Sequence, residues 1–402
     1  DARAIQPASA AQAAWRFYGN PDITLQQVFS PILGEARTVI PQACQEFVLV
    51  ACDWCKLHYK DHHGKKGRIE LANSKDLGYE MFTGLAMDDR DGRPIAPLWI
   101  ELRDQAGIHS TRDHQIRPAG SVLDEIVGNL RFVQSLALER QAVFIIDCEA
   151  DSIWHLRQWH AQAMQFVVRG KAWFTVMHEG KSRSLKQIGD LLHQGDCYLP
   201  GESFSYRGQE VRQWIAETEI TITRPARQRR QGQKEQRITG EPLTLRLVVA
   251  QLRSESGEVV ACWYLYTNVS ASVLASTVAC WYSWRWRIED YHKLLKSAGH
   301  ELENWGQESC EAIARRLAVA SMACVMVWRL QHDESESASA AKDLLVRLSG
   351  RRMGRGRRWT APSLLAGLWI LLSLESAIAQ YGLDTLLSTA AELRQLIASN
   401  FT

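Results

Sequence analysis

The sequence predicts an α/β protein with a mixed core sheet, a large and mostly β insertion, and a helical C-terminal region. Two apolar runs, 46–53 and 142–147, each end in an aspartate, as buried central strands do. A helical pattern at 151–162 separates the second run from a third, 165–169, and this strand–helix–strand order is typical of α/β folds. Between 173 and 267 apolar and polar residues alternate, which predicts further strands.

The remaining elements follow from the same periodicities and from their boundary residues. A polar segment, 60–78, is expected to be a loop, and 333–341 a linker. The expected helices are 8–18, 24–30, 121–138 (capped by Ser121), 151–162, 272–297, 308–331, 362–379 and 383–398. Besides the three runs above, the expected strands are 79–88, 95–103, 198–206, 211–224, 243–252 and 259–267.

These elements predict five segments along the chain. They are a helical N-terminal remnant (1–40), the first part of the core (41–172), the β insertion (173–268), the second part of the core (269–332) and the helical C-terminal region (333–402).

Composition limits the possible functions and locations. The net charge is only +2, so contact with nucleic acid requires local clusters of basic residues. The nine cysteines are odd in number and scattered, which indicates reduced thiols in a cytoplasmic protein. Cys52 and Cys55 lack the second pair that would complete a zinc site. No signal peptide is recognisable, and the apolar run 364–374 is too short to span a bilayer, so no membrane partner is expected.

One basic stretch is a candidate for phosphate contact. Residues 224–237 carry six basic residues against one glutamate, among them Arg227, Arg229 and Arg230. A solvated hairpin tip is the alternative interpretation. A second basic cluster covers 351–358.

The segment 281–296 contains no proline or glycine and is expected to be helical. Four of its residues, Tyr282, Arg285, Glu289 and Lys296, stand at i, i+3, i+7 and i+14. On a regular helix they fall within about 60° of arc, on one face. This face thus carries one carboxylate among three groups that can bind phosphate. The combination predicts that Glu289 binds a metal ion and that the other three residues bind a nucleic-acid backbone.

Asp53 and Asp147 supply the two acids that such a metal site lacks. A ribonuclease-H-like core presents two aspartates on neighbouring strands and a further carboxylate, here Glu289, from a helix. Three hard oxygen ligands favour Mg²⁺ or Mn²⁺. Two such ions would activate a water or a 3′-hydroxyl and stabilise the leaving oxygen in phosphoryl transfer.

The spacing Tyr282-x2-Arg285-x3-Glu289-x6-Lys296 resembles the signature of the insertion-sequence-four family of DDE transposases, which are bacterial cut-and-paste enzymes. Ala51-Cys-Asp53 and Asp147-Cys-Glu-Ala-Asp151 are similar to the two aspartate boxes of that family, although Cys148 departs from the arginine expected there. Phe166-Val-Val-Arg169 and Trp263-Tyr-Leu-Tyr-Thr267 resemble further segments in the same order.

The resemblance implies a role for each matching residue. Asp53, Asp147 and Glu289 would be the metal-binding catalytic triad. Tyr282, Arg285 and Lys296 would grip phosphates around a flipped base, with Trp263 stacked on that base and Trp286 filling its place. Arg169 and Lys171 would contact DNA as well. Plain strand core is the alternative role for Trp263.

The activity implied is metal-dependent nicking, hairpin formation and strand transfer at transposon ends. Double-stranded DNA, as transposon end and as target, would be the partner, and a homodimer would act in the synaptic complex. Two alternatives remain open: a related nuclease that lacks strand transfer, and a domesticated protein that only binds DNA.

Overall fold

The structure is a computed structural model that describes residues 8–120, 122–228, 236–297, 299–354 and 358–400. The chain forms two compact units, and each is described by itself. The sheet unit comprises Ser30–Lys56 and Tyr79–Asp290. The helical unit comprises Asp1–Phe29, Leu57–Gly78 and Tyr291–Thr402.

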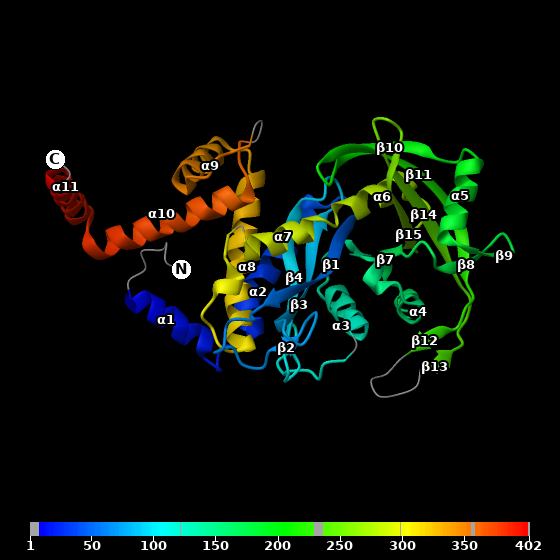
Figure 1. The fold of residues 1–402 in the computed structure, drawn as a ribbon, viewed down its shortest axis with the longest axis horizontal. Coiled ribbons are helices and arrows are strands. Elements are labelled where there is room, and N and C mark those ends of the chain that lie inside the picture. The colour runs from blue at the N-terminus through cyan, green and yellow to red at the C-terminus, as the bar shows by residue number, and fades with distance from the viewer. Residues whose placement is uncertain (1–7, 121, 229–235, 298, 355–357, 401–402) are drawn as a thin grey trace. The chain divides into compact units, whose positions relative to one another are not determined.

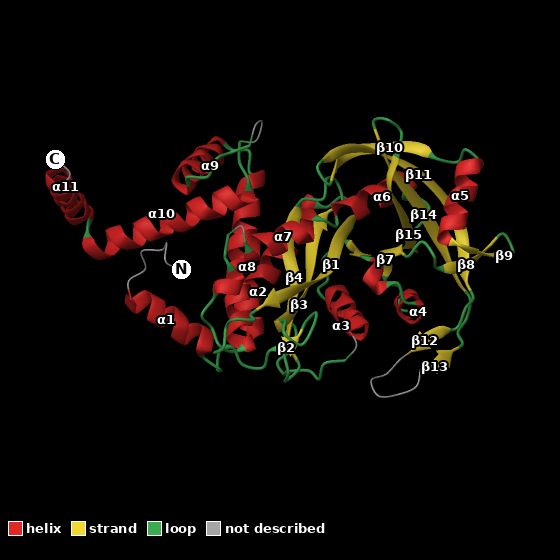
Figure 2. Ribbon diagram, in the orientation of Figure 1, coloured by secondary structure: helices red, strands yellow, loops and turns green. Residues whose placement is uncertain are grey.

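One mixed sheet dominates the sheet unit (Figures 1 and 2). Its strand order is β5-β4-β3-β1-β6-β7-β15-β14-β11-β8-β9, with β10 paired to β11. Strand β2 pairs with Leu77 and Gly78 at the start of β3, and these paired residues belong to the helical unit. The strands before the insertion are β1 (Phe47–His58), β2 (Ile69–Glu70), β3 (Leu77–Asp88), β4 (Pro94–Arg103), β5 (Ile108–Ser110), β6 (Gln141–Ile146) and β7 (Gln165–Gly170). The segment 60–78, expected to be a loop, therefore contains the short strand β2.

Three central strands, β1, β6 and β7, run parallel. Residues 48–52 of β1 are fully buried, which explains why the sequence reads there as an unbroken apolar run. Parallel neighbours need crossover connections. Helix α3 (Val122–Ser135) lies in the crossover from β1 to β6, and α4 (Ile153–Ala161) lies in the crossover from β6 to β7. The predicted cap of α3, Ser121, lies outside the described residues.

The β insertion extends the same sheet, because β15 pairs antiparallel with β7. Its strands are β8 (Thr175–His178), β9 (Lys181–Ser184), β10 (Leu199–Tyr206), β11 (Gln209–Ile222), β12 (Ala226–Gln228), β13 (Gln236–Ile238), β14 (Leu243–Ser254) and β15 (Val259–Thr267). The strands predicted from alternation are confirmed. The helix α5 (Leu185–Gln194) was not expected, although Ser184 and Gln187 form a capping box at its start.

The helix predicted over 272–297 is two helices, α6 (Ala275–Trp284) and α7 (Arg287–Lys296). Around the break the backbone bonds are of the tighter i to i−3 kind: the amide of Arg285 donates to Tyr282 and that of Ile288 to Arg285. This turn directs Arg285 inward, with 4% of its surface exposed, while Trp286 beside it is 41% exposed. The prediction of one regular helix did not include this change in side-chain direction at the break between α6 and α7.

Helices make up most of the helical unit, and α8 packs against α1, α9 and α10. Gly367 of α10 lies so close to the Leu345 carbonyl of α9 that no side chain fits between the two helices. The helices are α1 (Ala8–Gly19), η2 (Leu302–Asn304), α8 (Cys310–His332), α9 (Glu336–Ser349), α10 (Ala361–Tyr381) and α11 (Leu383–Asn400).

Three expectations for the helices are corrected. Helix α2 (Leu25–Ala43) begins in the helical unit and continues in the sheet unit, so it runs well past the predicted end at 30. The segment 333–341 is not a linker throughout, because Ser335 caps α9 through the amide of Ala338. The apolar run 364–374 belongs to a 21-residue helix, α10, whose mean hydropathy of 1.6 makes it, within the described residues, the one helix able to cross a membrane by length and composition.

Candidate metal and nucleic-acid site

The two aspartates stand side by side on neighbouring parallel strands. The last residues in register are Cys52 of β1 and Ile146 of β6, so the next step along each strand reaches Asp53 and Asp147. Equal register places both side chains on the same face of the sheet, with neighbouring strands about 4.8 Å apart. Asp147 follows the end of β6, as predicted, but β1 continues past Asp53 to His58, so Asp53 does not end its strand.

Arg285, at the break between α6 and α7, connects all three predicted acids. Its Nη1 lies 3.5 Å from Oδ2 of Asp53, and its Nη2 lies 3.4 Å from Oδ2 of Asp147 and 2.9 Å from Oε1 of Glu289. The structure therefore brings together three carboxylates from β1, from the residue after β6, and from the first turn of α7. The sequence predicted the carboxylates but not that a buried guanidinium would lie among them.

Asp147 has three further partners. The Tyr282 hydroxyl donates to its Oδ1 over 3.2 Å, Nη2 of Arg169 lies 2.7 Å from the same oxygen, and the amide of Cys148 donates to it over 2.5 Å. Arg169 also contacts the Cys148 sulfur at 3.3 Å. Asp147 is thus held in a single orientation by donors from β7, from α6 and from its own 3₁₀ turn, η1 (Cys148–Ala150).

The protonation of the three acids differs because their donors differ. Burial raises the pKa of Asp53 to about 6, despite the opposing charge of Arg285. Burial also raises the pKa of Asp147, but Arg285, the Cys148 amide and Arg169 together outweigh it and leave this pKa below its usual value. The pKa of Glu289 is raised, chiefly by burial, with Arg285 acting against it. Two of the three carboxylates therefore lack full compensation of their charge.

The predicted DNA-stacking residues are placed differently. Trp263 is 2% exposed and packs edge-on against Tyr282, with ring centroids 5.1 Å apart, and stacks on Phe204. The structure thus places Trp263 in the core, the alternative that the sequence left open. Trp286 is exposed, with the Arg285 guanidinium carbon 5.3 Å from its ring.

Lys296 belongs to the helical unit, where its ammonium lies 3.0 Å from Oε1 of Glu303. Tyr282 and Arg285 are buried in the sheet unit and bound to carboxylates. In this structure the signature residues assigned to phosphate therefore contact acids instead.

A second feature of the sheet unit is a cavity of about 560 Å³ lined by Lys171, Arg224, Arg227 and Arg237. Lys171 and Arg227 were predicted to contact DNA, whereas Arg229 and Arg230 lie outside the described residues. The cavity is also lined by Trp173, which is 71% exposed. Trp173 was not predicted as a functional residue; its place two residues after Lys171 and three after the end of β7 was the available signal.

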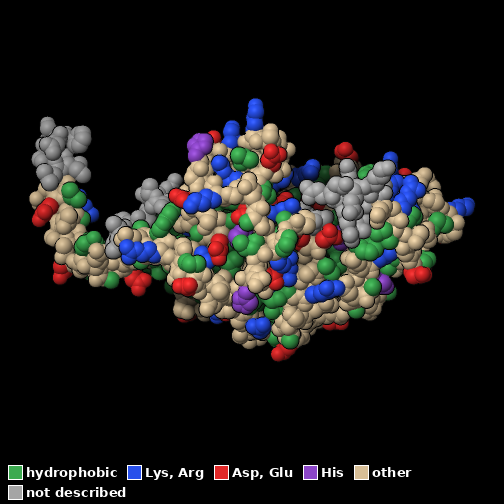
Figure 3. All heavy atoms as spheres, turned by 90° about the horizontal axis from the view of Figure 1, so that it is seen from below, with side chains coloured by type: hydrophobic (Ala, Val, Ile, Leu, Met, Phe, Trp, Pro, Cys, Tyr) green, Lys and Arg blue, Asp and Glu red, His purple; other side chains and the backbone are tan. Residues whose placement is uncertain are grey.

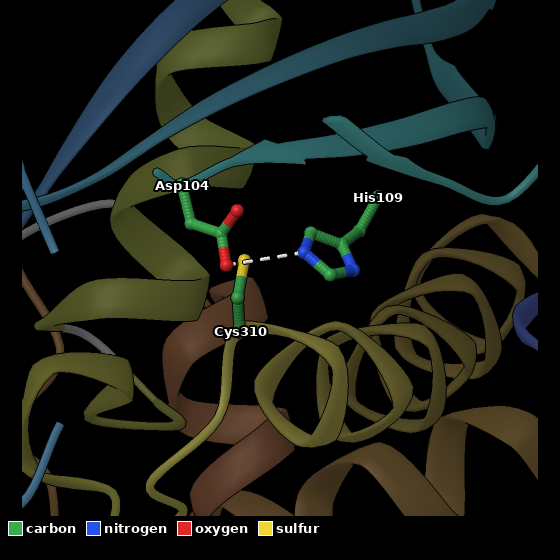
Figure 4. Close-up of side chains that lie close together, drawn as sticks. All are labelled: Asp104, His109 and Cys310. Atoms are coloured by element: carbon green, nitrogen blue, oxygen red, sulfur yellow. Dashed lines mark ion pairs between the residues drawn. The ribbon is translucent and has the colours of Figure 1, made fainter. Parts of the chain in front are cut away.

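A further charged cluster in the sheet unit consists of Glu101 and Asp113 with Arg112 and Arg117, and its formal charges cancel. On the face drawn in Figure 3, basic side chains are scattered among acidic ones, in keeping with the small net charge. In the sheet unit, the ring of His109 on β5 lies 3.2 Å from Oδ2 of Asp104, the residue after β4 (Figure 4). This pair fastens the edge of the sheet.

No family model matches the chain. Among solved structures, the chain is similar to a piggyBac transposase in a synaptic complex with hairpin DNA, at 11% sequence identity and a TM-score of 0.33. The match covers 87% of this chain and 57% of that one, so the chain spans little more than half the length of the transposase. A likeness of this size assigns neither a reaction nor a site residue.

Proposed function

We propose that the protein is a DNA transposase that cuts and joins phosphodiester bonds at DNA ends with the help of divalent metal ions. The observation that carries the proposal is the meeting of Asp53, Asp147 and Glu289 around Arg285. The strand order β4-β3-β1-β6-β7, with β1, β6 and β7 parallel, supports a ribonuclease-H-like core. The spacing of Tyr282, Arg285, Glu289 and Lys296 supports the proposal that the chain is a member of the insertion-sequence-four family.

The three acids fit a site for hard cations. They offer only carboxylate oxygens, the ligands that Mg²⁺ and Mn²⁺ prefer. Their charges sum to −3, and Arg285 and Arg169 together return +2, which leaves −1 for bound cations to neutralise. When bound, such ions would activate the attacking oxygen and stabilise the leaving one.

The other residues of the site position its acids. Tyr282 and Arg169 fix the orientation of Asp147 by donating to one of its oxygens. Arg285 holds the three acids together against their mutual repulsion. For Arg285 and Tyr282 to grip a phosphate, as the family resemblance implies, they must first release these carboxylates. DNA and metal binding are therefore expected to favour each other.

Removal of one acid tests the proposal directly. The substrate is a DNA end from the sequence flanking the gene, already nicked on one strand, incubated with Mn²⁺. We expect the wild-type chain to form a hairpin product. Glu289→Gln should lower this rate by about 10²- to 10³-fold or more, since it removes a ligand of the cations that would stabilise charge at the reacting phosphate, while binding persists. Asp290→Asn, an exposed neighbour on α7, is the matched control. Undiminished cleavage by Glu289→Gln would refute the assignment of the triad.

Strand transfer distinguishes a transposase from a nuclease with the same core. A pre-cut end is supplied together with a supercoiled target plasmid, and we expect end–target joints to form. Cleavage without any joints would identify the nuclease instead. We further predict that the protein acts as a homodimer bound to two transposon ends and that it is located in the bacterial cytoplasm.

A further inference from the structure

The cavity in the sheet unit is formed by four chain segments. Residues 151–153 come from the start of α4, 171–174 from the turn after β7, and 224–227 from the connection of β11 to β12, while Arg237 is added from β13. Its volume of about 560 Å³ lies within the range of small-molecule binding sites. A cavity of this size holds one nucleotide but not a base pair with its backbones.

The charge of the cavity selects an anion. Lys171, Arg224, Arg227 and Arg237 contribute +4 against −1 from Asp151, a sum of +3. Among the described residues, no carboxylate oxygen lies within ion-pair distance of Lys171, Arg224 or Arg237. The acid has a structural task, because Oδ2 of Asp151 accepts a hydrogen bond from the amide of Lys171 over 2.9 Å. It thereby fixes the turn that carries Lys171.

An aromatic platform lies within this basic lining. Trp173 exposes 71% of its surface, an unusual amount for so large an apolar side chain. The Lys171 ammonium lies 5.9 Å from the centre of its ring. The next residue, Phe174, is buried and carries the Arg224 guanidinium at 4.3 Å from its ring. The turn is thus anchored by Phe174, which leaves the indole of Trp173 available for stacking.

A flat, exposed indole among cationic side chains is the combination that binds single-stranded nucleic acid, since the base stacks and the phosphate is neutralised. The cavity is also near the acids: Asp151 follows Asp147 by four residues through η1, about 8 Å at the rise of a 3₁₀ turn. We propose that this cavity binds one unpaired nucleotide of a DNA strand next to the reacting phosphate, with its base on Trp173 and its phosphate on Lys171, Arg224 and Arg237. That the strand is DNA rests on the proposed function.

The test uses the full chain without metal and a duplex end whose single-stranded overhang carries the fluorescent base 2-aminopurine. We expect quenching of the base on binding. Trp173→Ala should abolish the quenching and weaken binding of the overhang by about 5- to 150-fold, the equivalent of one stacked base. Trp173→Phe should retain most of both, because it keeps an aromatic face. Trp15→Ala, which removes another exposed tryptophan on α1, is the matched control.

Unchanged quenching and affinity in Trp173→Ala, or an equal loss in Trp15→Ala, would overturn the proposal. An overhang of RNA that binds more tightly than DNA of the same sequence would overturn the assignment to DNA. Failure of the proposed function looks different. If the wild type neither cuts nor joins DNA in Mn²⁺ but Trp173→Ala still loses quenching, the transposase proposal is refuted, whereas the proposal that the cavity binds a nucleotide is retained.

Discussion

The two charged regions of the sheet unit are built in opposite ways. At the carboxylate site three acids surround Arg285, which is 4% exposed, and its guanidinium lies within 2.9–3.5 Å of all three carboxylates. At the cavity four cations surround an open volume, and its largest apolar side chain, Trp173, faces solvent. One region is a closed network with a surplus of negative charge, and the other is an open surface with a surplus of positive charge.

This difference predicts how each region responds to substitution. A group removed from a buried ionic network leaves its partners uncompensated at low dielectric, so folding suffers together with function. A group removed from an exposed surface is replaced by water, so only ligand binding changes. Three predictions test this contrast, beginning with the largest effect.

Arg285→Met should lower the free energy of unfolding by about 3–5 kcal/mol in metal-free buffer, because three acids lose their common partner. The measurement is equilibrium unfolding in urea. Arg287→Met, an exposed arginine at the start of α7, is the control and should change the free energy by less than about 0.5 kcal/mol. Equal stability of the two variants would show that the carboxylate site is no more tightly coupled to folding than the surface.

The second prediction concerns Asp53→Asn in the metal-free protein. We expect the free energy of unfolding of this variant, minus that of the wild type, to be more positive at pH 7.5 than at pH 4. The folded pKa of Asp53, about 6, lies above the unfolded value of 3.8, so the folded state holds the proton over a wider pH range. The stability contributed by this group is present below about pH 4 and is lost as the pH rises through about 6. The shift in the pKa of Asp53 corresponds to a change of up to about 3 kcal/mol, between these two pH values, in the free energy of unfolding of the variant relative to the wild type.

The measurement for Asp53→Asn is urea unfolding across this pH range, with Asp290→Asn as the control. A constant difference between Asp53→Asn and the wild type at all pH values would contradict the raised pKa.

The smallest effect concerns salt. The double variant Arg224→Ala, Arg237→Ala should flatten the slope of log affinity against log salt for single-stranded DNA by about 1.4, at roughly 0.7 per phosphate contact. Titrations at several salt concentrations give this slope. The exposed pair Lys181→Ala, Lys186→Ala removes the same charge from β9 and α5 and should leave the slope unchanged. If both pairs flatten it equally, the cavity is only part of a diffuse basic surface.

The sequence predicted the parts of this molecule that follow from local patterns. Apolar runs located β1, β6 and β7, and the three acids were found from their position after or within such runs and on a helix. The break at Arg285 was not predicted, because no proline or glycine marks it, and the carboxylates of Asp53 and Asp147 that Arg285 contacts are distant in sequence. Trp173 and Trp263 show the same limit: both residues follow or lie in strands, yet one is exposed and the other buried. Whether such a tryptophan is exposed or buried depends on the residues that pack against it in the folded protein.

The register of β1 against β6 has a consequence for insertions and deletions. The acids match because Phe47 pairs with Gln141 and six residues on each strand then lead to Asp53 and Asp147. Deletion of one residue between them on β1 alone would turn Asp53 to the opposite face of the sheet, since successive side chains alternate. Relatives of this protein can therefore exchange the apolar side chains of this segment, but its length must stay constant.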